Sequence, residues 1–246
     1  MTTSPDSPQK TAAMLIIGDE ILSGRTKDAN LGYLAEWLVE LGIELREARV
    51  IADDVEVIAE TVNVLRQAYD YLFTTGGIGP THDDMTIEAV ARAFGVPLVL
   101  HEGARHNMVE VHGLELNEGR LRMITLPQGC ELVETKNAIA PGFQMGNVFV
   151  MAGIPKVMQA MLEGIRPRLE TSRPYTSITL TAHLPESTLS VPLRELQERN
   201  PDVRIGSYPF YTDGIPGADL VIRSRDPARA RSVAEDVRLM IAALME

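Results

Sequence analysis

Apolar residues alternate between continuous runs and helical spacing along residues 12–170. Ala12 to Ile17 is an unbroken apolar run, which is typical of a parallel strand buried on both faces. We predict further strands at 43–51, 69–73, 96–100 and 148–151. Apolar residues at helical spacing predict helices that begin near Asp28, Asp54, Ile87, Glu102 and Pro155. Because strands alternate with helices, we expect a three-layer α/β/α domain with a mostly parallel sheet.

The pattern changes after a hinge predicted at residues 171–174. Residues 173–246 predict a strand, a helix, a hairpin and a last helix, which together form a small α+β domain. The segment Gly214-Ile215-Pro216-Gly217 matches the Gly-x-x-Gly of KH nucleic-acid modules. It contains no basic residue, so a plain hairpin turn is favoured. The expected organisation is a disordered tail at 1–10, a main domain at 11–172 and the small domain at 173–246.

A glycine-rich turn at residues 74–86 joins a predicted strand to a predicted helix. Gly76, Gly77 and Gly79 can adopt positive φ and turn successive N–H groups toward one anion. The start of the following helix adds unpaired N–H groups and a positive dipole end. The sequence therefore predicts a phosphate site at this turn.

Acidic residues follow three of the predicted strands. Asp83 and Asp84 lie beside the glycines and would repel a phosphate unless a divalent cation lay between them, although one of the two is also expected to cap the helix. Asp19 and Asp53 follow two other strands, and ligands of open α/β sheets bind at the carboxyl edge. We therefore expect the acidic loops to converge on one site, although Asp53 and its neighbour Asp54 could equally cap a helix.

Composition narrows the class of protein. The 246 residues include 34 acidic and 23 basic residues, and the formal net charge of -11 argues against general affinity for nucleic acid or anionic membranes. A single cysteine excludes an intramolecular disulfide, and no apolar run is long enough to span a membrane, so we expect a cytoplasmic protein. Walker, dinucleotide-binding, nucleophile-elbow and zinc motifs are absent from the sequence. Phosphate contact is one interpretation of Arg120, Arg122 and His82, and a solvated surface position is the other.

The motifs together resemble the MoaB/Mog molybdopterin-binding domain, and more closely its CinA-like (competence/damage-inducible protein A) branch. The Thr-His-Asp-Asp form of the glycine turn also resembles the corresponding domain of eukaryotic FAD synthases. The likeness covers about residues 12–170. The matching features are Gly18-Asp19-Glu20, Ser23-Gly24, Asn30, Asp53-Asp54, Thr74 to Thr86, Asn117, Pro141-Gly142-Phe143 and Gly153-Ile154-Pro155.

The resemblance implies a MoaB/Mog-like fold followed by a small KH-like domain, and homo-oligomerisation. It implies that Asp53 and Asp84 are catalytic and hold a divalent metal such as Mg²⁺, Mn²⁺ or Co²⁺, with molybdopterin as a further candidate cofactor. The ligand-binding residues implied are Gly18, Asp19, Glu20, Ser23, Thr75, Gly76, Gly77, Gly79, Pro80, Thr81, Asp83 and Asn117. The chain ends where full-length CinA proteins continue into an amidohydrolase domain, so we do not expect deamidase activity.

Three functions remain open at this point. The leading hypothesis is metal-dependent cleavage of a nucleotide pyrophosphate such as ADP-ribose or FAD, which CinA-like domains are linked to. The second is adenylylation of molybdopterin by the same acids, as in Mog-type proteins. The third is a non-catalytic RNA-binding protein that acts through Gly214 to Gly217, and the net acidity weighs against it.

Overall fold

The computed structural model describes residues 9–133, 135, 139–212 and 214–245. The chain divides into two compact units, Met1–Ser172 and Arg173–Glu246. Most of the tail expected to be disordered, residues 1–8, lies outside the described residues. Lys10, just before the first strand, forms ion pairs with Asp70 at 3.4 Å and Glu170 at 3.0 Å.

The first unit is built on a six-stranded sheet. Its strand order is β2–β1–β3–β8–β7–β6. The strands are β1 (Thr11–Ile17), β2 (Glu44–Ile51), β3 (Tyr71–Thr75), β6 (Glu131–Val133), β7 (Gly142–Met145) and β8 (Val148–Met151). The neighbouring pairs among β2, β1, β3 and β8 are parallel, while β7 runs antiparallel to both β8 and β6. The expected mostly parallel sheet is confirmed.

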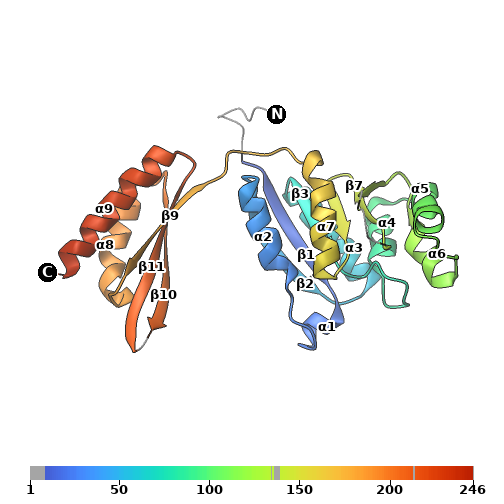
Figure 1. The fold of residues 1–246 in the computed structure, drawn as a ribbon, viewed down its shortest axis with the longest axis horizontal. Coiled ribbons are helices and arrows are strands. Elements are labelled where there is room, and N and C mark those ends of the chain that lie inside the picture. Colours follow the sequence, from blue (N-terminus) through green and yellow to red (C-terminus); the bar gives the residue numbers. More distant parts are fainter. Residues whose placement is uncertain (1–8, 134, 136–138, 213, 246) are drawn as a thin grey trace. The chain divides into compact units, whose positions relative to one another are not determined.

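Helices cover both faces of this sheet (Figure 1). One face carries α2 (Asn30–Glu40) and α7 (Pro155–Ile165), and the other carries α3 (Val55–Ala68) and α4 (Thr86–Phe94). Trp37 of α2 connects this helix to α7 and to the sheet. Its Nε1 donates to Glu163 of α7 at 3.2 Å, and its ring makes an edge-to-face contact with Phe73 of β3. The three-layer α/β/α architecture expected from the alternating pattern is confirmed.

The remaining elements of this unit are short helices, turns and strands. They are α1 (Asp19–Leu22), β4 (Leu98–Leu100), α5 (Glu102–His106), a π-helical turn (Asn107–Val111), α6 (Glu118–Ile124), β5 (Thr125–Pro127) and a 3₁₀ turn (Arg166–Arg168). β4 pairs only with β5, in a separate two-stranded antiparallel sheet. The helix predicted from 102 to 111 is therefore two short pieces, and β4, β5 and α6 form a small lobe beside α4.

The second unit is α+β, as expected. It comprises β9 (Thr176–Ala182), α8 (Glu186–Arg199), β10 (Arg204–Thr212), β11 (Ile215–Ser224) and α9 (Pro227–Met245). The strands form an antiparallel sheet in the order β10–β11–β9, and an apolar cluster that includes Leu189, Leu220 and Val233 joins it to both helices. The likeness to KH domains stays a prediction.

The turn expected over residues 214–217 is shorter in the structure. β11 begins at Ile215, so most of the Gly-x-x-Gly segment belongs to a strand, and the prediction of a turn across it was wrong. Pairing between β11 and β9 begins only at Ala218, so the missing N–H of Pro216 does not interrupt that pairing.

Each helix in the described part of the chain is too short or too polar to span a lipid bilayer.

The strand order changes direction at β1, which lies between β2 and β3. Ligands bind in open α/β sheets at the carboxyl ends of the strands beside such a switch point. Here the chain leaving β3 passes directly over the end of β1. Gly76 has a φ of 99°, and a Cβ built on it would overlap the carbonyl oxygen of Ile17. Only glycine allows this close approach.

We expect Gly76→Ala to lower the free energy of unfolding by about 2 kcal/mol or more, because alanine meets both an unfavourable φ and a backbone oxygen. Urea denaturation would measure the change. Gly32→Ala is the matched control, since Gly32 lies inside α2 with no atom within 4 Å of its added Cβ. It should be neutral or stabilising by up to about 1 kcal/mol. Equal effects of the two substitutions would contradict the close approach at Gly76.

Candidate ligand site at the carboxyl edge of the sheet

The glycine loop between β3 and α4 folds back onto the first residue of the helix. Gly76 and Gly77 both have positive φ, at 99° and 67°. The N–H of Thr86 donates to the Gly77 carbonyl at 3.0 Å, and the Thr86 hydroxyl donates to the Gly76 carbonyl at 2.8 Å. The fully buried Thr86 therefore fixes the shape of the loop from below.

The Asp84 side chain stabilises the same loop through hydrogen bonds. Its carboxylate accepts hydrogen bonds from the N–H of Gly79 at 2.7 Å, the N–H of Thr81 at 2.8 Å and the Thr81 hydroxyl at 2.5 Å. The expectation that Asp83 or Asp84 caps α4 was wrong, because the helix is preceded by Met85 and has no side-chain cap. The Asp84 carboxylate binds the loop's own N–H groups instead.

The loop therefore differs from an open phosphate nest. The N–H of Gly76 donates to the Met151 carbonyl at 3.2 Å, and the N–H of Gly79 donates to Asp84. Of the three glycines, only Gly77 has an N–H without a partner in the described part of the chain. Asp84 itself occupies the position of an anion held by backbone N–H groups.

The pair Asp53-Asp54, which follows β2, divides into two roles. Asp54 caps α3, because its Oδ1 accepts from the N–H groups of Glu56 at 2.9 Å and Val57 at 3.0 Å. Asp53 points to the neighbouring loop, and its Oδ2 accepts from the N–H of Asp19 at 2.9 Å. This bond joins the loops that follow β1 and β2 at the carboxyl edge.

Asp53 carries a negative charge in acidic surroundings. Burial raises the pKa of its carboxyl group, and the nearby charges of Asp19, Glu20 and Asp83 raise it further, while the hydrogen bond from the Asp19 N–H acts in the opposite direction. Asp83 itself is exposed, and the Thr81 hydroxyl, which it shares with Asp84, lowers the pKa of its carboxyl group. Acids from all three predicted loops therefore interact electrostatically around Asp53.

These acids suit a cation that is shared with a ligand. Among the described residues, no group of three or more Asp, Glu, His or Cys side chains is arranged to hold a metal ion. Mg²⁺ in phosphate sites is bound by one or two carboxylates, with the remaining positions taken by water and substrate oxygens. Asp53, with one carboxylate oxygen free of protein donors in the described chain, fits that pattern better than Asp84, which accepts three hydrogen bonds.

Asn30 and Thr75 add unpaired polar atoms to this edge. Asn30 is 5% exposed, and its Nδ2 donates to the Gly153 carbonyl at 2.8 Å. Gly153 in turn lies against Gly76, since a Cβ built on it would come within 3.4 Å of the Gly76 Cα. The Asn30 Oδ1 and the Thr75 Oγ1 are buried without a partner in the described residues. Sequence reasoning named Asn30 only as a matching feature and missed that it braces the glycine loop.

Asn117 and the two arginines lie on or beside α6. Asn117 caps this helix, because its Oδ1 accepts from the N–H of Arg120 at 2.9 Å. Gly119 places the helix against the loop, where a Cβ would come within 3.0 Å of Pro80. Arg120 donates to the Glu115 carbonyl at 2.6 Å, whereas Arg122 lines a pocket together with Asp84. The structure thus separates two arginines that the sequence could not distinguish.

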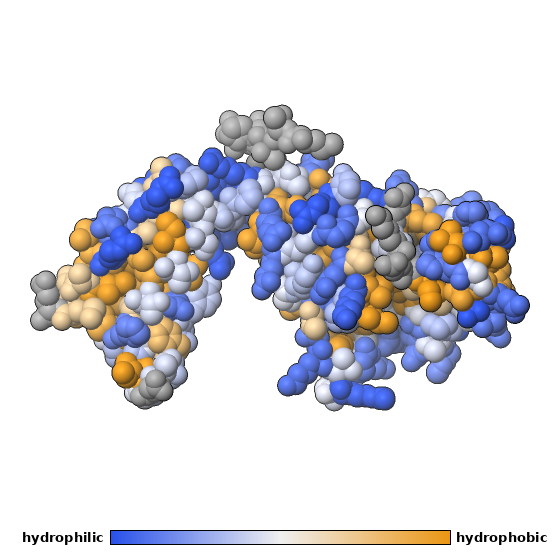
Figure 2. All heavy atoms as spheres, viewed as in Figure 1, coloured by the Kyte–Doolittle hydropathy of each residue, from blue (hydrophilic) through white to orange (hydrophobic). Residues whose placement is uncertain are grey.

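The other predicted ligand residues lie around the loop after β1. Gly18 is buried and its N–H donates to the Ile51 carbonyl at 3.1 Å. Glu20 and Ser23 are exposed, and the Ser23 hydroxyl donates to the Glu20 carbonyl at 3.3 Å. His82 is exposed on the glycine loop. Figure 2 shows hydrophilic residues over α1 at this edge of the unit.

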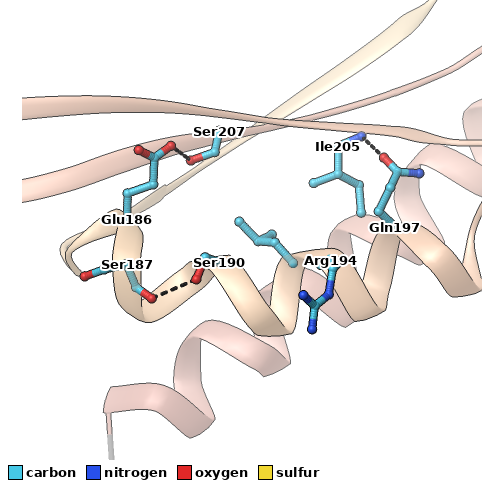
Figure 3. A pocket seen from close by; sticks show the side chains of 8 residues that line it. Glu186, Ser187, Ser190, Arg194, Gln197, Ile205 and Ser207 are labelled. Carbon is cyan, nitrogen blue, oxygen red and sulfur yellow. Dashed lines mark hydrogen bonds between the residues drawn. The ribbon is translucent and has the colours of Figure 1, made fainter.

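A larger groove of about 480 Å³ lies in the second unit, between α8 and β10 (Figure 3). Hydrogen bonds cross it at both ends, from the Ser207 hydroxyl to Glu186 at 2.8 Å and from the Ile205 N–H to Gln197 at 2.9 Å. These polar groups satisfy one another. We therefore assign the site to the smaller pocket and acidic loops of the first unit.

The fold and its glycine loop define an α/β domain whose candidate ligand site lies at the switch point of a mainly parallel sheet. Residues 13–171 match the family model described as a probable molybdopterin binding domain, and residues 174–245 match the model described as FAD synthase, middle domain. The chain belongs to the molybdopterin-binding-domain family, in its CinA-like branch.

Relatives match over most of the chain. A protein of Archaeoglobus fulgidus is 36% identical and the match covers 80% of this chain and 84% of that protein. A probable FAD synthase of Caenorhabditis elegans is 31% identical over 98% of this chain and 52% of its own length. The crystal structure of a CinA protein of unknown function from Thermoplasma acidophilum is 32% identical, with a TM-score of 0.61, covering 65% of this chain and 98% of that one.

The pKa of Asp53 yields a prediction for stability against pH. Because the folded-state pKa is raised, the native state retains a proton to higher pH than the unfolded chain does, so this group's contribution to stability falls as pH rises through that window. We expect Asp53→Asn to gain stability relative to wild type as the pH rises from below the ordinary aspartate pKa of 3.8 toward neutrality. Urea denaturation at several pH values measures this difference.

Asp54→Asn is the control for that experiment, because asparagine caps helices as well as aspartate does. Its stability should follow the wild type across the same pH range. An Asp53→Asn difference that stays constant with pH would contradict the raised pKa.

Proposed function

We propose that the first unit binds a nucleotide or pterin phosphate together with a divalent cation and cleaves a pyrophosphate bond. The observation that carries this proposal is the half-buried Asp53, which lies among the charges of Asp19, Glu20 and Asp83 beside a glycine loop. Such a cluster repels a bare phosphate, but it favours a phosphate that arrives with a cation.

In this proposal Asp53 holds the cation with its free carboxylate oxygen, and the bond from the Asp19 N–H fixes the direction of that carboxylate. The N–H of Gly77 donates to a phosphate oxygen. The cation, when bound, supplies neutralisation of the charge that develops on the pyrophosphate and a more acidic water molecule. Asp84 keeps the loop in shape through its bonds to Gly79 and Thr81.

The substrates that we propose are dinucleotide pyrophosphates such as ADP-ribose or FAD. The match of residues 174–245 to the middle domain of FAD synthase, and the similarity to a probable FAD synthase, support a flavin or adenine nucleotide. The family model of the first unit supports a second candidate, adenylylation of molybdopterin by the same edge of the sheet.

We expect wild-type protein to release AMP from ADP-ribose or FAD with Mg²⁺, Mn²⁺ or Co²⁺, and Asp53→Asn to reduce the turnover by about 100-fold or more, because an amide is a poor ligand for a hard cation. Chromatographic detection of AMP measures both. Asp54→Asn should retain wild-type turnover.

Asp84→Asn is a weaker test, because the single amide oxygen of asparagine can accept from Gly79 or from Thr81 but not from both, so the substitution would disturb the loop. Full turnover by Asp53→Asn would refute the role of this carboxylate. If wild type released no AMP with any of the metals, pyrophosphate release from ATP in the presence of molybdopterin would favour the transferase instead.

A further inference from the structure

A pocket of about 270 Å³ lies directly beside the glycine loop, with Gly79 and Asp84 in its wall. Ile87, Leu98 and Leu121 give it apolar sides from α4, β4 and α6. Leu98 is 38% exposed and Leu121 is 41% exposed, although both are large apolar residues. Figure 2 shows apolar residues gathered at this end of the unit, which carries α5 and α6. Apolar walls with a few convergent polar groups are typical of small-molecule sites.

Arg122 supplies a positive charge at the same pocket. Within the described part of the chain, its guanidinium makes no hydrogen bond or ion pair, and its charge lowers the pKa of Asp83. Arg120, two residues earlier on the helix, is instead bound to the Glu115 carbonyl. A guanidinium that lines the pocket and interacts with the charge of Asp83 has its fork of N–H donors available for phosphate oxygens.

Glu88 and Glu118 also line the pocket. Ionised carboxylates only accept hydrogen bonds, so they favour a ring whose edge carries donors, such as the exocyclic amine of adenine. The volume of about 270 Å³ lies just below the usual range for ligand pockets, about 300–1,000 Å³, so the pocket suits one nucleoside rather than a whole dinucleotide.

We propose that this pocket binds the adenine ring of the substrate between Leu98 and Leu121, and that Arg122 contacts the phosphate nearest to that nucleoside. The next phosphate then lies toward Gly77 and the acids around Asp53. This inference rests on the proposed pyrophosphate function, and it assigns the end of the substrate that the protein recognises. Leu121 then determines selectivity for the nucleoside, and Arg122 supplies affinity for the phosphate.

The test compares two probes that resist hydrolysis and differ only by the nucleoside. Calorimetric titration with Mg²⁺ would measure the affinity of α,β-methylene-ADP and of methylenediphosphonate. We expect Leu121→Ala to weaken α,β-methylene-ADP by roughly fivefold and leave methylenediphosphonate unchanged, since only the nucleoside contacts this side chain. Arg122→Gln should weaken both probes by about tenfold or more, because it removes a charge-assisted contact to phosphate.

Matched controls separate these effects from general damage. Arg120→Gln removes the neighbouring arginine, and Leu239→Ala truncates an exposed leucine of the second unit, which at 61% is more exposed than Leu121. Both controls should bind both probes like wild type. AMP should displace α,β-methylene-ADP at lower concentration than IMP, which lacks the exocyclic amine; equal displacement would overturn the assignment of the adenine ring.

Failure of this inference can be distinguished from failure of the proposed function. If wild type cleaves ADP-ribose while Leu121→Ala and Arg122→Gln bind both probes normally, the adenine lies elsewhere and only the subsite is wrong. If wild type binds neither probe and releases no AMP, both proposals are wrong.

Discussion

The close approach of two backbones at the switch point constrains the whole carboxyl edge of the first unit. The chain leaving β3 passes over the end of β1 so tightly that Gly76 cannot carry a side chain. From that contact the loop continues to Thr86, which holds it on α4, and to Gly153, which lies beside Gly76 and is bonded to Asn30. Loops from three strands and the starts of two helices therefore depend on one glycine.

The acidic residues at this edge have different structural roles, although all of them are carboxylates. Asp54 caps a helix, Asp84 braces a loop, and Asp53 joins two loops while keeping one oxygen free of donors in the described chain. Geometry, rather than residue type, makes the difference. An acid that accepts three backbone or hydroxyl donors is stabilised as an internal anion, whereas a half-buried acid among like charges attracts a cation.

The sequence predicted the parallel strands β1, β2, β3 and β8 but not the antiparallel strands β6 and β7. Ala12 to Ile17 was recognisable because buried parallel strands are continuous apolar runs. The sequence also predicted which loops meet at the carboxyl edge. It did not predict that Asp84 turns back onto Gly79, because that choice depends on the fold of the loop and leaves no periodic signal. The pocket beside α6 was missed for a related reason: Leu98 and Leu121 belong to short elements whose burial is set by tertiary contacts.

The Asp84 carboxylate accepts hydrogen bonds from its own loop, so it competes with any bound phosphate for the N–H groups of that loop. A phosphate that is to use the N–H groups of Gly79 and Thr81 must displace a tethered carboxylate, whose effective concentration is far higher than that of any anion in solution. A lone inorganic phosphate would therefore compete poorly for these N–H groups. A ligand that also brought a ring or a cation would add interactions elsewhere, so under the proposed function the Asp84 carboxylate would select against small anions.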